Sequence, residues 1–225
     1  MPSDTRRCAG PKGARPRAMA ISDPVARQEA GLDLDGWLDL LLDAGVDTVQ
    51  LREKADGRAC DPATLLRRAR RVVERADGRL QVLVNGRADI ALAAGADGVH
   101  LPASGLPTRA LRRRFPSLIV GRSTHSRPEA LQARDDGADY MTFSPIFATP
   151  SKARFGAPQG VDALAELVAD GLPVVALGGI DPETLRRVAP LGVGCAAIRA
   201  FHDAESCRSM VDGLRTVDSS LILGA

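Results

Sequence analysis

Short apolar runs alternate with longer amphipathic runs along most of the chain. The short runs, such as "TVQLR" and "LQVLVN", have the length and branched side chains of buried strands. The longer runs, such as "PATLLRRARRVVERA", repeat their apolar residues at helical spacing. Several of the longer runs begin at a proline and stop at a glycine, as helices commonly do. The alternation therefore predicts parallel strands joined by helical crossovers.

The pattern predicts eight strands and eight helices in strict alternation. The expected strands are "AMAIS", "TVQLR", "LQVLVN", "GVHLP", "LIVGRS", "YMTFSP", "PVVALGG" and "CAAIRA". The last helix is expected at 204–216. Eight such units in 225 residues close most simply into a single (β/α)8 TIM barrel. A doubly wound open sheet competes, but it calls for a glycine-rich turn after the first strand, and "AISDPVAR" has none.

The two ends of the chain fall outside this pattern. Residues 1–16 are charged and contain no apolar run, so we expect a disordered N-terminal tail. The barrel is expected over 17–217, followed by a C-terminal tail over 218–225.

Composition narrows the class of partner. A net charge of +2 and an aromatic content of 3% argue against nucleic acid. No apolar run reaches membrane length, and the four cysteines form no paired motif. We therefore expect a cytoplasmic protein with a small-molecule ligand, no nucleic-acid partner and no membrane partner, and a homo-oligomer is possible.

Polar residues gather where the expected strands end, which is where TIM barrels carry their chemistry. In "VQLREK", Gln50, Arg52 and Lys54 alternate and would share one face of a strand, which favours an anionic ligand. The alternative is a solvated outer face. Lysine is rare in this chain, which otherwise uses arginine, so Lys54 argues for the ligand.

Two loops are candidates for binding phosphate. Backbone N–H groups after the seventh and eighth strands bind phosphate in many TIM barrels, and the residues there are Gly178, Gly179, Ile198, Arg199 and Ala200. The alternative is that the two glycines only make a tight turn. The long loop "SPIFATPSKARFGAPQG" adds Thr149, Ser151 and Lys152, which could hold an oxyanion, or the loop is plain surface.

The chain has three histidines. His125 closes "GRSTHS" and has the same parity as Ser123, so both can face the open end of the barrel. A neutral imidazole there would serve as a proton shuttle, whereas the alternative is a histidine at a helix entry with no role. We expect His100 to be a structural group at the barrel end and His202 to be solvated.

These motifs, in this order, resemble the superfamily of thiamine phosphate synthase and TenI. The resemblance implies a synthase that condenses a pyrimidine pyrophosphate with a thiazole phosphate and releases pyrophosphate. Gln50, Arg52, Lys54, Asn85, Ser123, Thr149, Ser151 and Lys152 match the synthase motifs, with serine in place of the second threonine of the "Thr-x-Thr-Lys" loop. Two magnesium-binding aspartates of the family do not match, because Gly86 and Gly105 stand at their positions.

The departures are similar to the TenI-type thiazole tautomerases. "NGRADIAL", "LPASG" and "GRSTHS" carry this likeness, and it implies that His125 is the acid and base of a tautomerase. The expected function is thus a thiazole tautomerase, an isomerase of thiamine biosynthesis, with a thiazole phosphate as substrate and no metal or cofactor. One alternative is a thiamine phosphate synthase with an altered site, which would need Mg²⁺. Another is a non-catalytic regulatory protein that binds thiamine phosphate.

Overall fold

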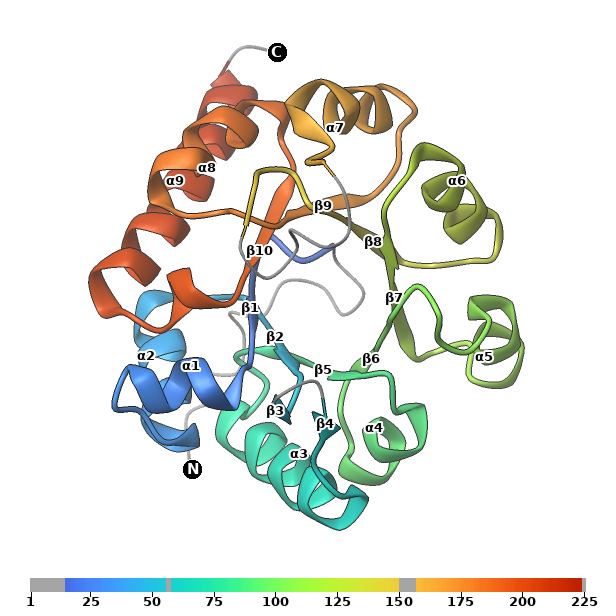
Figure 1. Cartoon of the computed structure of the whole chain (residues 1–225), viewed down its shortest axis with the longest axis vertical. Coiled ribbons are helices and arrows are strands. Elements are labelled where there is room, and N and C mark those ends of the chain that lie inside the picture. Colours follow the sequence, from blue (N-terminus) through green and yellow to red (C-terminus); the bar gives the residue numbers. More distant parts are fainter. Residues whose placement is uncertain (1–14, 56–57, 150–156, 224–225) are drawn as a thin grey trace, which may run out of the picture.

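The computed structural model describes residues 15–55, 58–149 and 157–223. Eight parallel strands close into a barrel in the order β1-β10-β9-β8-β7-β6-β5-β2, and helices surround it (Figure 1). The barrel strands are β1 (Ala18–Ile21), β2 (Thr48–Leu51), β5 (Gln81–Asn85), β6 (Gly98–Leu101), β7 (Ile119–Thr124), β8 (Tyr140–Phe143), β9 (Val174–Leu177) and β10 (Gly194–Ala197). The predicted (β/α)8 TIM barrel is confirmed.

Several of the helices begin where the sequence provides a capping side chain. Asp61, Ser126 and Asp181 each accept a hydrogen bond from a backbone N–H in the first turn of the helix that follows. The helices are α1 (Pro24–Glu29), α2 (Leu34–Ala44), α3 (Pro62–Ala76), α4 (Ala88–Ala94), α5 (Thr108–Arg114), α6 (Arg127–Asp135), α7 (Gly160–Ala169), α8 (Pro182–Val188) and α9 (Ala204–Leu223). Two 3-10 turns, η2 (Ala189–Leu191) and η3 (Arg199–Phe201), flank β10.

Three local features were not expected from the sequence. Helix α1 has only 6 residues, too few for a helical periodicity, and is fixed by Asp23 at its N-cap. A small antiparallel hairpin, β3 (Lys54–Ala55) with β4 (Arg58–Ala59), follows β2, and strands of 2 residues leave no alternation to detect. Helix α9 continues to Leu223, beyond position 216 where we expected it to end.

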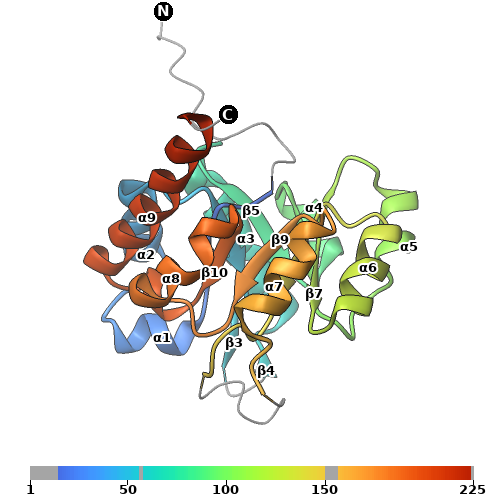
Figure 2. The same cartoon turned by 90° about the horizontal axis from the view of Figure 1, so that it is seen from above.

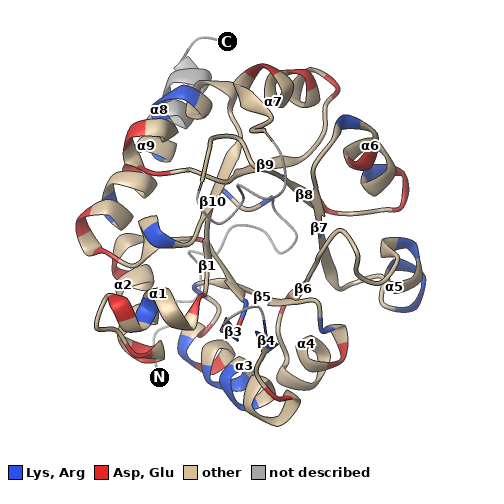
Figure 3. Ribbon diagram, viewed as in Figure 1, with Lys and Arg blue, Asp and Glu red and all other residues tan. Residues whose placement is uncertain are grey.

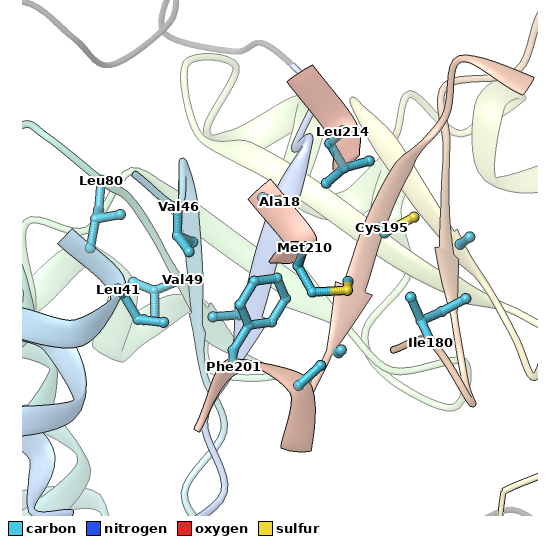
Figure 4. Packing of buried hydrophobic residues seen from close by; sticks show 14 of the residues in the cluster. Ala18, Leu41, Val46, Val49, Leu80, Ile180, Cys195, Phe201, Met210 and Leu214 are labelled. Atoms are coloured by element: carbon cyan, nitrogen blue, oxygen red, sulfur yellow. The ribbon is translucent and has the colours of Figure 1, made fainter. Parts of the chain in front are cut away.

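The barrel has a packed interior and a second core outside the strands. Inside, Met19, Leu83, Ile119, Tyr140 and Val175 form one cluster, so the centre is filled by side chains. The larger cluster lies between the strands and the helices, and Figure 4 shows part of it. Both layers follow from strands that are apolar on both faces, as parallel strands buried between helices must be.

The two ends of the barrel differ. Figure 2 shows the hairpin β3–β4 at the end opposite the last turns of α9. The hairpin follows β2 directly, so its end of the molecule is the one where the strands have their carboxyl ends, and we call this end the mouth. In the described ranges, none of the helices is both long enough and apolar enough to cross a lipid bilayer.

Candidate functional site at the mouth of the barrel

An amide pair lies across β2 and β5. The Asn85 side-chain N–H donates to Gln50 Oε1 at 3.0 Å, and the Gln50 Nε2 lies 3.6 Å from Met19 Sδ. Gln50 is buried, while Asn85 is half-buried. The bond fixes the orientation of both amides, and it turns the Asn85 Oδ1 acceptor toward other partners.

The expectation that Gln50, Arg52 and Lys54 share one face of a strand is wrong for Arg52 and Lys54, because only Gln50 lies in β2. Strand β2 ends at Leu51, and Lys54 opens the separate hairpin. Arg52 lies between them and makes a long ion pair of 3.4 Å with Asp23, with both side chains partly exposed. The structure therefore places two cations, Arg52 and Lys54, at the rim of the mouth, and a neutral amide, Gln50, inside it.

Glu53 points the other way and is the residue that sequence reasoning missed. Its buried carboxylate accepts from Arg27 at 2.7 and 2.9 Å, from Ser22 Oγ at 2.8 Å, and from Arg68. Burial would raise the pKa of Glu53, but the hydrogen bonds and charges of Arg27, Ser22 and Arg68 outweigh it and lower the pKa. The only sequence signal for this orientation was the position of Glu53 between Arg52 and Lys54, which puts its side chain on the opposite face of an extended segment. The cluster anchors the segment that carries these two cations.

The two glycines after β9 lie close to the loop that follows β8. A Cβ on Gly178 would lie 2.8 Å from Pro145 Cα, and one on Gly179 would lie 2.7 Å from Phe147 Cβ. Both glycines have a positive φ, of 96° and 68°. The Gly178 carbonyl accepts from Phe147 N at 2.9 Å, whereas no acceptor for the N–H of Gly178 or Gly179 is found within the described residues. The tight-turn interpretation accounts for both glycines.

The turn after β10 is held by a histidine. Ile198, Arg199 and Ala200 lead into η3, and the Ile198 carbonyl lies 2.7 Å from His202 Nδ1. The expectation that His202 is solvated is wrong, because it is 7% exposed and stacks on Trp37 at 5.4 Å between ring centroids. Burial lowers the pKa of His202, and the contact of its ring with the Ile198 carbonyl supports the turn.

His125 lies at the end of β7, close to the β8 loop. Its Nδ1 is 2.7 Å from the Ser144 carbonyl oxygen, and its backbone N–H donates to Glu129 at 2.7 Å. Because a carbonyl only accepts, Nδ1 carries a proton and donates it to this oxygen. Thr149 is half-buried further along this loop. Ser151 and Lys152 lie outside the described residues.

Ser123 contacts His100 rather than His125. His100 Nε2 lies 2.9 Å from Ser123 Oγ, and His100 Nδ1 lies 2.9 Å from the Tyr140 hydroxyl. His100 is 2% exposed, and burial lowers its pKa to about 3, so the ring is neutral at physiological pH. The sequence-based interpretation of His100 as a structural group overlooked this link to a candidate site residue.

Among the described residues, a magnesium site built on carboxylates does not fit this mouth. Gly86 and Gly105 provide no ligand, and a Cβ on Gly105 would lie 3.0 Å from both Cδ and O of Pro102. Across the ranges that the structure describes, no group of three His, Cys, Asp or Glu side chains could hold a metal ion. The nearby Asp89 is exposed and paired with Arg87. We therefore assign no step to a protein-bound metal.

The comparisons with known proteins agree on one family. A family model, TMP-TENI, described as thiamine monophosphate synthase, matches residues 19–201. A thiamine-phosphate synthase of Anaeromyxobacter dehalogenans (strain 2CP-C) is 43% identical over 179 residues, which cover 79% of this chain and 74% of that protein. A putative thiamine-phosphate synthase of Geobacter sulfurreducens (strain ATCC 51573 / DSM 12127 / PCA) is 44% identical over 177 residues, covering 77% of this chain and 82% of the relative.

A solved structure agrees. The thiamine phosphate pyrophosphorylase from Pyrococcus furiosus superposes with a TM-score of 0.75 at 26% identity, covering 93% of this chain and 98% of that one. The assignment as a thiazole tautomerase, and hence as an isomerase, is wrong, because relatives between 39% and 44% identical are named thiamine-phosphate synthase. The match of the family model, together with these relatives, shows that the chain belongs to the thiamine monophosphate synthase family.

Proposed function

We propose that this protein is a thiamine-phosphate synthase, a transferase that joins a pyrimidine pyrophosphate to a thiazole phosphate. The observation that carries the proposal is 43% identity over 179 residues to a protein of that name. The proposed partners are therefore two small phosphorylated molecules. A cytoplasmic location and a homo-oligomeric state stay predictions.

In this reaction one bond breaks and one forms. The bond between the pyrimidine's side-chain carbon and a pyrophosphate oxygen breaks, and pyrophosphate leaves with the electron pair. The ring nitrogen of the thiazole then donates its lone pair to that carbon. No proton has to leave this nitrogen, so we assign His125 to binding at the mouth rather than to proton transfer.

Arg52 and Lys54 would bind the leaving pyrophosphate. Negative charge builds up on that group as the carbon–oxygen bond breaks, so cations held at the rim stabilise the transition state more than the ground state. The Glu53 cluster holds the intervening residue in place, which keeps both cations at the rim without further ordering. Lys152 is a third candidate cation for the same group.

The thiazole phosphate would bind beside β9 and β10. The N–H groups of Gly178 and Gly179 and the turn at Ile198, Arg199 and Ala200 lie at the ends of these neighbouring strands. Backbone N–H groups suit a phosphate because several can point at its oxygens together. The Gln50–Asn85 pair, with oriented donor and acceptor atoms, is suited to reading the edge of the pyrimidine ring.

Growth complementation tests the proposal in a cell. A bacterial strain that lacks its own thiamine-phosphate synthase should grow without added thiamine when it expresses this chain. The Arg52→Ala variant should rescue poorly, since losing one such charge typically costs on the order of 10²-fold in rate. Absence of growth with the wild-type chain, although the protein accumulates in soluble form, would refute the proposal.

A further inference from the structure

We propose that Tyr140 and His100 form a hydrogen-bond relay that fixes Ser123 as a hydrogen-bond donor to the substrate. In this proposal Ser123 touches the substrate, whereas His100 and Tyr140 are positioning residues that act through it. The kinetic part rests on the proposed function, and the structural part does not.

The three side chains come from three consecutive barrel strands. His100 is in β6, Ser123 in β7 and Tyr140 in β8, and both links of the relay are 2.9 Å long. Tyr140 and His100 are 0% and 2% exposed, while Ser123 is half-buried. The relay therefore runs from the closed interior of the barrel to the mouth.

The space for Tyr140 is made by a glycine. A Cβ on Gly121 would lie 2.2 Å from Tyr140 Cζ and 2.3 Å from its hydroxyl oxygen. Gly121 pairs with His100 in the register of β6 and β7, and with Tyr140 in that of β7 and β8. The absence of a side chain at this position thus lets the phenol lie across β7 and reach the imidazole.

The direction of the hydrogen bonds follows from counting protons. Tyr140 has one hydroxyl proton, and within the described residues His100 Nδ1 is the only partner that this hydroxyl has. If Nδ1 carried a proton, the buried hydroxyl proton would have no acceptor, which is a costly arrangement. Tyr140 therefore donates to Nδ1. A neutral imidazole carries one N–H, which must be at Nε2 and must donate to Ser123 Oγ.

This polarity determines what Ser123 can do. Its oxygen already accepts from His100, and within the described residues its own proton has no acceptor. The substrate atom at Ser123 should therefore be an acceptor, either an anionic phosphate oxygen or an unprotonated ring nitrogen. Thr142 supports a polar ligand here: it pairs with Ser123 in register, is 0% exposed, and its Oγ1 has no partner within the described residues.

Nitrogen NMR of the imidazoles tests the polarity directly. The chain contains three histidines, so uniformly ¹⁵N-labelled protein gives three ring systems, which His125→Asn and His202→Asn assign by elimination. We expect His100 to be the neutral Nε2–H tautomer throughout pH 6–8. A proton on Nδ1, or a cationic ring in that range, would overturn the proposal whatever the protein catalyses.

A double-mutant cycle tests the positioning role. When Ser123 is intact, His100→Leu should lower kcat/KM for thiamine phosphate formation about 10-fold. His100→Gln should lower it less, because glutamine retains a hydrogen-bond donor. In the Ser123→Ala background, both changes should have no more than about a 2-fold effect. Equal losses in the two backgrounds would overturn the relay. If wild-type protein makes no thiamine phosphate, the proposed function fails, and the tautomer measurement still decides the polarity.

Binding of small anions identifies the atom that Ser123 contacts. Weaker binding of inorganic pyrophosphate by Ser123→Ala in calorimetry would support a phosphate oxygen as the acceptor. Unchanged pyrophosphate binding together with a raised KM for the pyrimidine substrate would support a ring nitrogen. If Ser123→Ala changes neither pyrophosphate binding nor the KM for the pyrimidine substrate, Ser123 does not touch the substrate and the proposal is wrong.

Discussion

Thr142 and Thr124 are two buried threonines on neighbouring strands with different hydrogen bonding. Thr124 Oγ1 donates to the Thr142 carbonyl at 3.0 Å, while Thr142 Oγ1 has no partner within the described residues. Replacing an unpaired buried hydroxyl by a methyl group is close to neutral or stabilising, but removing a paired one loses a hydrogen bond. We therefore expect Thr142→Val to leave the free energy of unfolding unchanged or raise it, and Thr124→Val to lower it by about 1 kcal/mol.

Urea denaturation of both variants beside wild type measures this difference. Valine matches threonine in shape, so neither variant should change the packing much. The two variants therefore differ mainly in whether a hydrogen bond is lost. A loss for Thr142→Val as large as that for Thr124→Val would show that the Thr142 hydroxyl is already satisfied, which would remove one support for a ligand at this point of the mouth.

The neutral His100 makes stability depend on pH. Burial lowers its pKa to about 3 from the ordinary 6.5, so between these values the unfolded chain binds a proton that the folded chain does not. Stability should therefore fall as pH drops below 6.5, by up to about 1.4 kcal/mol per pH unit from this residue. Above 6.5 both states are neutral, and His100 contributes no slope.

Denaturation of wild type and His100→Gln at pH 4.5, 5.5 and 6.5 isolates this effect. Other titrating groups change the slope equally in both proteins, so the difference between the two curves belongs to His100. The wild type should lose stability faster than the variant as pH falls. If the stability of the two proteins fell in parallel with pH, His100 would titrate normally in the folded protein. That result would contradict the effect expected from its burial between Tyr140 and Ser123.

At the scale of elements, Glu53 joins pieces that are distant in sequence. It follows β2 and binds Arg27 in α1, Arg68 in α3, and Ser22 at the end of β1. Removing its charge leaves the buried Arg27 without its charge partner, and the partly exposed Arg68 loses the same carboxylate. We expect Glu53→Gln to lower the free energy of unfolding by about 3 kcal/mol.

The exposed Arg87–Asp89 pair is the matched control for Glu53. Its side chains are 39% and 64% exposed, and Asp89→Asn should change stability by less than about 0.5 kcal/mol. Equal effects of Glu53→Gln and Asp89→Asn in the same denaturation series would show that the buried cluster does not hold these elements together.

The loops after β5 and β6 should not be easily converted into a metal site. Gly86 has a φ of 69°, which aspartate tolerates at some cost, and its nearest neighbour would be 3.7 Å from a Cβ. Gly105 has no such room, since Pro102 would lie at 3.0 Å. We expect the double change Gly86→Asp with Gly105→Asp to be less stable than Gly86→Asp alone and to gain no Mg²⁺ binding in calorimetry. Tight Mg²⁺ binding without loss of stability would contradict this description of the loop.

For the whole molecule, the barrel could be predicted from sequence because its signals are repeated and local. Each βα unit carries a short apolar run and a helical run, and several helices add a capping side chain or a glycine stop. Eight consistent units leave few other topologies. The hairpin at Lys54 and helix α1 could not be predicted, because elements of 2 and 6 residues contain too little pattern.

The candidate site was harder to predict than the fold. The alternation of Gln50 and Arg52 indicated polar groups at the right strand end, but the partners of Glu53 and His100 come from other strands and helices, and sequence spacing does not reveal such contacts. The functional assignment failed for a related reason. Gly86 and Gly105 show what the chain lacks, whereas the proposed reaction would depend on the residues that bind pyrophosphate.

Product stoichiometry tests the proposed function most directly. Purified protein, given the pyrimidine pyrophosphate and the thiazole phosphate over a range of Mg²⁺ concentrations, should produce thiamine phosphate and pyrophosphate in equal amounts. Ser123→Ala and Arg52→Ala should each slow both products together. Failure to form thiamine phosphate at any Mg²⁺ concentration by a folded protein that binds both substrates, or release of pyrophosphate without thiamine phosphate, would contradict the assignment as a synthase.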